Sequence, residues 1–427
     1  MATFSAQQFI GGSVDIFDYF SYLSTTPIVS AGGSVFTGTA GEDIVRVIGN
    51  GDLIQGLGSD DILDYQGDGG LISGGDGNDV AAVVGNNNFI LGGDGSDKLG
   101  LSGSDNNISG GDGDDEAEVY GSDNIISGGD GNDTLEISYG SLNTFDAGAG
   151  NDKATVESNE NTVNGGSGDD LAIVFGDENT VNGNNGDDLA SIFGNINTVN
   201  GGNGEDSAFI YGDENTFNGN NSSDTAVVSG NKNTIDGGSG NDKATVSGEN
   251  NTVKGGNGDD TITAEVGSNG NTFSGGNGND TYILQQFDDQ DLITTIDVIN
   301  DLGAAGETET VDLSAYASSD FNFNLEGDIL SLRNAEDGVD IINFSEDDFS
   351  LVFSDVTVDS TNIDDFLPAE PPTFEESLEH AISSFLGVDE LDLEITNPGV
   401  LEFTITDNGL SSTGSLDISG FLGLFST

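Results

Sequence analysis

GGSGDDLAIVFGDENTVN (165–182) is followed by GNNGDDLASIFGNINTVN (183–200) and GGNGEDSAFIYGDENTFN (201–218), three successive segments that share one pattern of 18 residues. The pattern extends from residue 38 to residue 283, and the last Asp of its Gly-rich turn returns at steps of 17 to 20 residues. A period this short fits one coil of two strands and two turns, because a helix pair needs more residues. The sequence therefore predicts an all-β fold, a parallel β-roll or β-solenoid with coils of about 18 residues.

Apolar residues alternate within each coil and indicate which side chains face the interior. The inward positions of the longer strand are Ala172, Val174, Ala190, Ile192, Ala208, Ile210, Ala244 and Val246. Those of the shorter strand are Val181, Val199, Phe217, Ile235 and Val253. We therefore expect a thin core that holds a few small apolar side chains in each coil.

Charge and composition exclude several classes of function. The chain of 427 residues has 7 basic and 77 acidic residues, so its net charge is 7 − 77 = −70, which repels nucleic acid and anionic membranes. It has no Cys and one His, His380, which rules out disulfides, thiolate metal sites and most His-based or Cys-based catalysis. Residues 1–30 lack a basic region before an apolar one, so we expect neither an ordinary cleaved leader nor membrane insertion.

The Gly-rich turns predict a metal site. They read, for example, GGDGND (74–79), GGDGDD (110–115) and GGNGND (275–280). Glycine permits the left-handed backbone that turns carbonyls inward, and the last Asp adds a carboxylate, so stacked turns offer the hard oxygen ligands that Ca²⁺ prefers. The predicted ligands are Asp43, Asp60, Asp79, Asp97, Asp115, Asp133, Asp152, Asp170, Asp188, Asp206, Asp224, Asp242, Asp260 and Asp280.

These turns resemble the GGxGxDxUx repeat of the RTX (repeats-in-toxin, hemolysin-type) calcium-binding β-roll family, and the chain is similar to its non-enzymatic surface-layer and filament members. The resemblance implies one Ca²⁺ between successive turns, about 13 ions along one edge, which would offset over a third of the net charge. The alternative is that the acidic residues only keep the surface hydrated.

The second turn of each coil departs from the family pattern, because Asn stands where the family has Asp. These residues are Asn88, Asn106, Asn124, Asn143, Asn161, Asn179, Asn197, Asn215, Asn233, Asn251 and Asn271. Stacked amides can hydrogen-bond to one another without a metal. We therefore expect calcium on one edge and a mostly metal-free Asn ladder on the other, with Asp52 as an exception.

Two sets of outward residues predict surfaces. An apolar set would form a self-assembly face that docks another copy or the chain's own flank: Leu171, Ile173, Phe175, Leu189, Phe193, Phe209, Tyr211 and Val227. Rows of Thr and Asn, such as Thr180 with Asn182 and Thr198 with Asn200, resemble the flat arrays of ice-binding solenoids. The alternative is that these polar rows only face water.

The repeat and the segments on either side of it predict a chain of five parts. Residues 1–37 hold several aromatic residues and would form an N-terminal cap or assembly arm, before the calcium-binding solenoid of 38–283. Residues 284–366 resemble the β-rich C-terminal cap of secreted RTX proteins, and 367–373 form a Pro-rich linker. Residues 374–427 predict a small α+β tail, with strands at 391–395 and 401–405, whose end resembles a type I secretion signal; an assembly module is the competing use.

Together these features predict a non-catalytic structural protein, since the chain has no GxSxG or HExxH motif. We expect an extracellular or cell-surface protein, exported by type I secretion, that folds on calcium and self-assembles into a surface layer, sheath or filament. Its expected partners are other copies of itself and calcium, with a cell-surface polysaccharide as a further candidate. A calcium-dependent adhesin or ice-binding module acting as a soluble rod, and an enzyme with its cleft in 284–427, are the alternatives.

Overall fold

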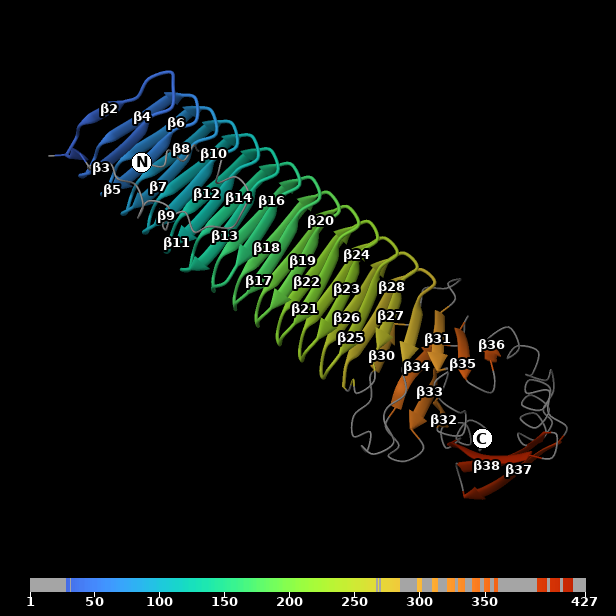
Figure 1. Cartoon of the computed structure of the whole chain (residues 1–427). Helices are drawn as coiled ribbons and strands as arrows, with labels where there is room; N and C mark the ends of the chain where they lie inside the picture. The colour runs from blue at the N-terminus through green and yellow to red at the C-terminus, as the bar shows by residue number, and fades with distance from the viewer. Residues whose placement is uncertain are drawn as a thin grey trace. The chain divides into compact units, whose positions relative to one another are not determined.

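The computed structural model describes residues 28–30, 32–265, 268 and 270–284, and separate strands between residues 298 and 417. The chain divides into two compact units, residues 1–218 and 219–427, and each is described by itself. The fold is an all-β parallel solenoid, as the repeat predicts (Figure 1). The described residues include no helix with the length and apolar character that a membrane span requires.

In the first unit, successive strands alternate between two parallel sheets. The first sheet consists of β1 (Ile28–Val29), β3 (Ile44–Ile48), β5 (Ile62–Gln66), β7 (Val80–Val84), β9 (Lys98–Ser102), β11 (Glu116–Tyr120), β13 (Thr134–Tyr139), β15 (Lys153–Val156), β17 (Leu171–Phe175), β19 (Leu189–Phe193) and β21 (Ser207–Tyr211). The second consists of β2 (Val35–Thr37), β4 (Leu53–Gly58), β6 (Leu71–Asp76), β8 (Phe89–Asp94), β10 (Asn107–Asp112), β12 (Ile125–Asp130), β14 (Thr144–Ala149), β16 (Thr162–Ser167), β18 (Thr180–Asn185) and β20 (Thr198–Asn203), and β22 (Thr216–Asn221) begins in this unit.

The second unit continues the same coil pattern. Its coil strands are β23 (Thr225–Ser229), β24 (Thr234–Ser239), β25 (Lys243–Ser247), β26 (Thr252–Asn257), β27 (Thr261–Ala264), β28 (Thr272–Asn277) and β29 (Thr281–Leu284). Further strands follow at β30 (Val298–Asp301), β31 (Glu309–Leu313), β32 (Phe321–Glu326), β33 (Ile329–Asn334), β34 (Asp340–Ser345), β35 (Phe349–Phe353), β36 (Thr357–Asp359), β37 (Glu390–Asn397), β38 (Val400–Asp407) and β39 (Leu410–Asp417).

Residues beyond the coils include both parallel and antiparallel pairs. β31 pairs in parallel with β29, whereas β32, β33 and β34 pair antiparallel. The strands predicted at 391–395 and 401–405 lie in β37 and β38, which pair antiparallel. The N-terminal segment 1–27, the linker 367–373, the helix predicted from residue 374 and the chain end 418–427 lie outside the described residues, and the five-part division stays a prediction.

The register places each residue beside its equivalent in the next coil. Ala172 pairs with Ala190 in the first sheet, and Val181 pairs with Val199 in the second. All thirteen side chains predicted to face inward are buried, which confirms the alternation read from the sequence. The glycines of the turns allow this stacking: at Gly168, whose φ is 125°, a Cβ would collide with the carbonyl of Gly150 in the preceding coil.

Candidate metal centre

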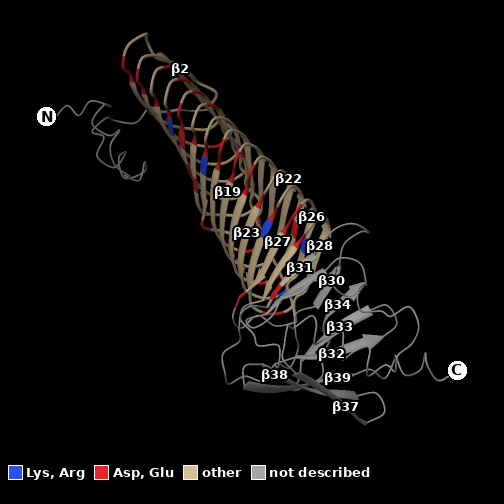
Figure 2. Ribbon diagram, turned by 90° about the vertical axis from the view of Figure 1, so that its right-hand side faces the viewer, with Lys and Arg blue, Asp and Glu red and all other residues tan. Residues whose placement is uncertain are grey.

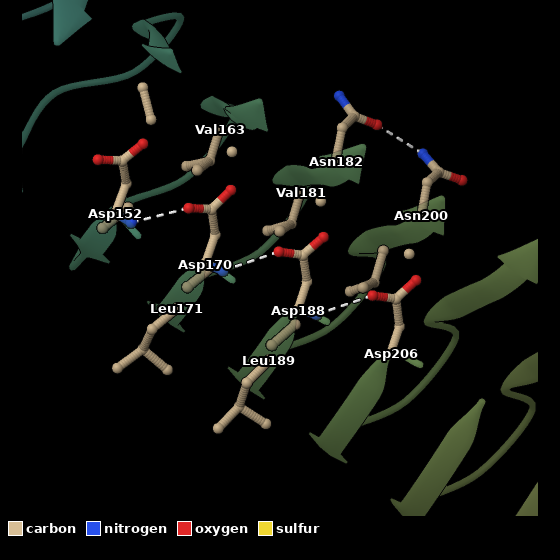
Figure 3. Close-up of a pocket in the computed structure, with 18 of the residues that line it drawn as sticks. Asp152, Val163, Asp170, Leu171, Val181, Asn182, Asp188, Leu189, Asn200 and Asp206 are labelled. Atoms are coloured by element: carbon tan, nitrogen blue, oxygen red, sulfur yellow. Dashed lines mark hydrogen bonds between the residues drawn. The ribbon is translucent and has the colours of Figure 1, made fainter. Parts of the chain in front are cut away.

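Buried Asp side chains form a ladder where each Gly-rich turn enters a strand of the first sheet. The backbone N–H of one Asp donates to Oδ1 of the equivalent Asp in the next coil. In the first unit these bonds run from Asp43 to Asp206 at 2.6–2.9 Å, and Figure 3 draws those that join Asp152, Asp170, Asp188 and Asp206. In the second unit they run from Asp224 to Asp280 at 2.7–2.8 Å. The stack therefore repeats one geometry from coil to coil.

The predicted ladder is wrong at one coil. Asp61, rather than Asp60, accepts from the N–H of Asp43 and donates to Asp79. Asp60 lies one residue earlier, where its Oδ1 accepts from the N–H of Asn78 on the turn surface. Asp43 also differs from the rest, because it is half-exposed and Oδ2 accepts from the N–H of Thr39. The other predicted residues occupy equivalent ladder positions.

At ten ladder positions the second carboxylate oxygen lacks a donor. Oδ2 is buried without a hydrogen-bond partner at Asp61, Asp79, Asp97, Asp115, Asp133, Asp152, Asp170, Asp188, Asp242 and Asp260. At Asp170 this oxygen and the carbonyl of Gly183, in the next coil, both lie so close to Gly165 that a Cβ there would collide with them. These two acceptor oxygens thus lie next to the same small space beside Gly165. A proton or a cation is needed there to offset their repulsion.

The carboxyl pKa values reflect this burial. Loss of solvation, reinforced by neighbouring carboxylates, raises the pKa of Asp97 to about 8 and that of Asp115 to about 7 from the ordinary 3.8, against the opposing effect of the donated N–H. The same causes raise the pKa of Asp170 to about 7 and that of Asp188 to about 6. The ladder therefore favours uptake of positive charge near neutral pH.

The geometry limits which ligands an ion could have. Across the described residues, no three His, Cys, Asp or Glu side chains converge on one point. An ion beside Asp170 would therefore take backbone carbonyls, such as that of Gly183, together with carboxylate oxygens, which is a ligand set that suits Ca²⁺. A cavity of about 30 Å³ beside Asp152, Asp170 and Asp188 belongs to the apolar interior, because it is lined mostly by core side chains such as Phe145 and Val181. The residues present thus fit a calcium ion.

At one coil an alanine occupies the space beside the Asp oxygen. Ala147 stands where the neighbouring coils have Gly128 and Gly165, and it is buried beside the ladder. Its methyl group occupies the position that the other glycines leave open between the Asp oxygen and the next carbonyl. We expect the site at Asp152 to be the weakest of the ladder.

The opposite edge shows how the same backbone satisfies a neutral side chain. Asn106 donates its backbone N–H to Oδ1 of Asn124 at 3.0 Å, as the Asp residues do. Its Nδ2 then donates to the carbonyl of Gly85 at 3.1 Å and to Oδ1 of Asn124 at 3.0 Å. The predicted hydrogen-bonded Asn ladder is therefore confirmed, and all eleven of its side chains are buried. On this edge the amide Nδ2 donates to neighbouring acceptors, whereas on the other edge the second carboxylate oxygen has no donor at ten positions.

The first coils of the Asn edge depart from the repeat at two positions, of which the sequence indicated Asp52. Asp52 occupies an Asn position, is buried, and accepts from the N–H of Ser34 at 2.8 Å and the hydroxyl of Ser30 at 2.6 Å. One coil later the position is Gly70, and the ring of Tyr65 fills the space that a side chain there would take. The departure at Asp52 is visible in the sequence, whereas the periodic pattern does not indicate that the ring of Tyr65 fills the space at Gly70.

Replacing Asp by Asn on the Asp edge, and Asn by Asp on the Asn edge, tests the contrast between the two edges. In the calcium-free protein, we expect Asp188→Asn to raise the free energy of unfolding by about 1–3 kcal/mol, because an amide replaces an unpaired buried carboxylate. The matched change Asn197→Asp should lower it by about 3–5 kcal/mol by placing an uncompensated charge on the Asn edge. Urea unfolding in excess EGTA at pH 6, where partial protonation of the ladder carboxylates restores strand content, measures both, and equal effects of the two changes would contradict the assignment.

Comparisons with known proteins give a likeness of fold. No protein-family model matches the chain, and no curated protein matches its sequence. Among solved structures, it is similar to the X-ray structure of a hyperactive, Ca²⁺-dependent, β-helical antifreeze protein from an Antarctic bacterium. The two chains are 18% identical with a TM-score of 0.44, and the match covers 81% of this chain and 96% of that one.

Proposed function

We propose that this chain is a calcium-binding structural protein of the RTX type, with about 13 ions along the Asp edge and a mostly metal-free Asn edge. The observation that carries the proposal is the row of buried Asp oxygens without donors, most of them beside a glycine carbonyl of the next coil. A divalent cation satisfies both acceptors at once, whereas water would have to donate to both. Figure 2 shows the excess of acidic over basic residues that such ions would offset.

The same chemistry suits an exported protein. Without calcium, stacking the turns brings carboxylates of successive coils together, so the chain is expected to stay unfolded where calcium is scarce. Millimolar calcium outside the cell then drives folding, because the free energy of ion binding becomes free energy of folding. We place the protein outside the cell or on its surface, exported by type I secretion, with a cell-surface polysaccharide as a further candidate partner.

A charge-free apolar strip supports self-assembly of the folded chain. The rings of Phe175, Phe193 and Tyr211 stack at centroid distances of 5.0 and 5.2 Å, and each ring is about half exposed. Leu189 is also exposed, whereas Leu171, Ile173 and Phe209 are half-buried; Val227 takes an equivalent half-buried position in the second unit. None of the nine outward side chains of β17, β19 and β21 is charged. Contact through this strip would avoid the repulsion between two strongly acidic molecules.

Introducing a charge in the strip tests assembly. Phe193→Lys should leave the free energy of unfolding within about 0.5 kcal/mol of the parent, because the side chain is exposed, but should abolish ordered polymers. Thr155→Lys, on the same sheet outside the stacked rings, is the matched control and should still assemble. Electron microscopy with calcium and then with chelator gives the result. Single particles of the parent chain in both conditions would refute the assembly proposal.

Ice binding is a second candidate, favoured by the outward rows of the second sheet. Asn182, Asn200 and Asn218 each donate Nδ2 to Oδ1 of the preceding Asn at 2.7 Å, so the amides are held in a line. Thr180 and Thr198 lie in register beside them. Such a regular array of fixed polar groups can order water at the spacing of the strands.

A freezing assay separates this candidate from assembly. If the rows bind ice, the calcium-loaded chain should lower the temperature of ice growth below the melting point, and Thr198→Lys should remove most of that gap. Phe193→Lys, on the other sheet, should leave it unchanged. No gap in the parent chain would exclude ice binding and leave the assembly proposal untouched.

A further inference from the structure

An apolar row marks the start of the outward face of the second sheet. In register across β2, β4, β6 and β8, this row contains Val35, Leu53, Leu71 and Phe89. Leu91 lies beside the row, two residues after Phe89 on β8. Val35 is 64% exposed and Phe89 is 53% exposed, and the side chains of Leu71 and Leu91 are exposed as well. Together these five residues form the N-terminal patch.

The fold does not require apolar side chains in this row. After Asn107 and Ile125, the same position is a threonine in each strand from β14 to β20: Thr144, Thr162, Thr180 and Thr198. These strands pair in the same parallel register as β4, β6 and β8. A row of exposed apolar side chains that the fold can replace by threonine indicates a contact with another molecule.

The N-terminal patch is also free of charge in a strongly acidic chain. None of its five residues is charged, and the row beside it is uncharged as well: Thr37, Gln55, Ser73 and Leu91. The net charge of −70 makes two copies repel each other unless uncharged surfaces meet. A basic partner would be drawn to the acidic turns instead, so the N-terminal patch suits an uncharged apolar surface.

The strip on β17, β19 and β21 has the properties of such a surface. Its rings, Phe175, Phe193 and Tyr211, repeat at centroid distances of 5.0 and 5.2 Å, and the row in the N-terminal patch repeats at the strand spacing of about 4.8 Å. Equal spacing lets the side chains of one row fit between those of the other over several coils. Large rings also interdigitate better with Leu and Val side chains than with a second row of rings.

One chain cannot join its own N-terminal patch to its own strip. Both surfaces lie in the first unit, but on the outward faces of two sheets whose inward faces meet in the core. They are also displaced along the stack, because β7, which follows β6 in the chain, is six strands before β19, or roughly 30 Å. A contact between patch and strip therefore joins two copies and leaves one patch and one strip free.

We propose that the N-terminal patch of one copy docks on the strip of β17, β19 and β21 of a second copy. Such a head-to-tail contact uses different surfaces on its two partners, so it does not close into a symmetric dimer. Because the two surfaces face opposite ways, each added copy lies further from the first, and the copies form an open filament. This contact rests on the proposed self-assembly, for which it supplies the second surface.

Mixing two variants tests the contact, with sedimentation velocity of the full chains in calcium as the measurement. Phe193→Lys disables the strip and Phe89→Lys disables the patch, and both side chains are exposed. Each variant alone should sediment as a monomer, because every contact then meets a charged surface. Their equimolar mixture should contain a species of twice the mass, because the intact patch of one variant meets the intact strip of the other. Thr162→Lys, at the position of Phe89 on β16, is the matched control and should polymerise as the parent does.

A second variant makes the test independent of the introduced charge. Phe89→Thr with Leu91→Ser takes the residues that stand at these positions on other strands, Thr162 and Ser109, so it should fold as the parent does and behave as Phe89→Lys does. Dimers of each variant alone, with no new species in the mixture, would overturn the contact between patch and strip but leave self-assembly standing. Polymers of Phe89→Lys like those of the parent would also overturn it. A parent chain that stays monomeric in calcium would refute self-assembly itself.

Discussion

Removing calcium at pH 8 is expected to abolish most of the strand content of the chain. At this pH the ladder carboxylates are largely ionised, and each lies buried one coil from the next. An unpaired buried charge costs several kcal/mol, so a stack of about a dozen of them exceeds the net stability of an ordinary domain. Each ion, at 100 times its dissociation constant, restores about 2.7 kcal/mol. Folding should therefore follow calcium steeply.

Circular dichroism during a titration of the calcium-free chain measures this effect. We expect a disordered spectrum in excess EGTA, a sharp gain of β signal as calcium rises, and full reversal when chelator is added again. Magnesium is the control and should be much less effective, because it favours a tighter octahedral site and releases water reluctantly. Equal strand content in EGTA and in calcium would contradict the account.

Lowering the pH should substitute in part for calcium. The folded-state pKa values of Asp97 and Asp115 are raised to about 8 and about 7, against 3.8 for the ordinary carboxyl. Between these limits the folded chain binds more protons than the unfolded chain, so stability without calcium falls as pH rises. The contribution is fully present below about pH 4 and is lost as pH rises through 6 to 8. The calcium-free chain should thus gain strand content between pH 8 and pH 5.

Calcium should act in the opposite direction over the same range. Ions bind the deprotonated carboxylates, so the calcium affinity should fall as the pH drops from 8 to 5. The strand content by circular dichroism at pH 5 and pH 8, with EGTA and with calcium, gives the four values needed. We expect calcium to raise the strand content strongly at pH 8 and weakly at pH 5. A calcium-free chain that is more stable at pH 8 than at pH 5 would contradict the raised pKa values.

The repeat made most of the fold predictable. Inward positions such as Ala172 and Val174 follow from strict alternation, and the Asn ladder follows from Asn recurring at one phase of the coil. The error at Asp60 arose because two Asp residues are adjacent in the turn 56–61; counting 18 residues from Asp43 or back from Asp79 reaches Asp61. The period was thus more reliable there than the local motif.

Features that do not recur from coil to coil could not be predicted from the sequence. The carbonyls beside each Asp oxygen depend on how neighbouring turns overlap, which the residues of one coil do not specify. The ring of Tyr65 beside Gly70 occurs at one coil, so a repeated pattern does not predict it. This departure lies near the start of the solenoid, where the regular stack begins.

Counting bound calcium tests the central claim most directly. After equilibrium dialysis against 1 μM to 10 mM calcium, elemental analysis of the folded chain should approach about 13 ions per chain, one for each gap between successive ladder residues. Asp188→Asn should lose one or two of them, and Asn197→Ser, on the other edge, should lose none. No saturable binding, or about 26 ions shared between both edges, would contradict a ladder of calcium ions along the Asp edge.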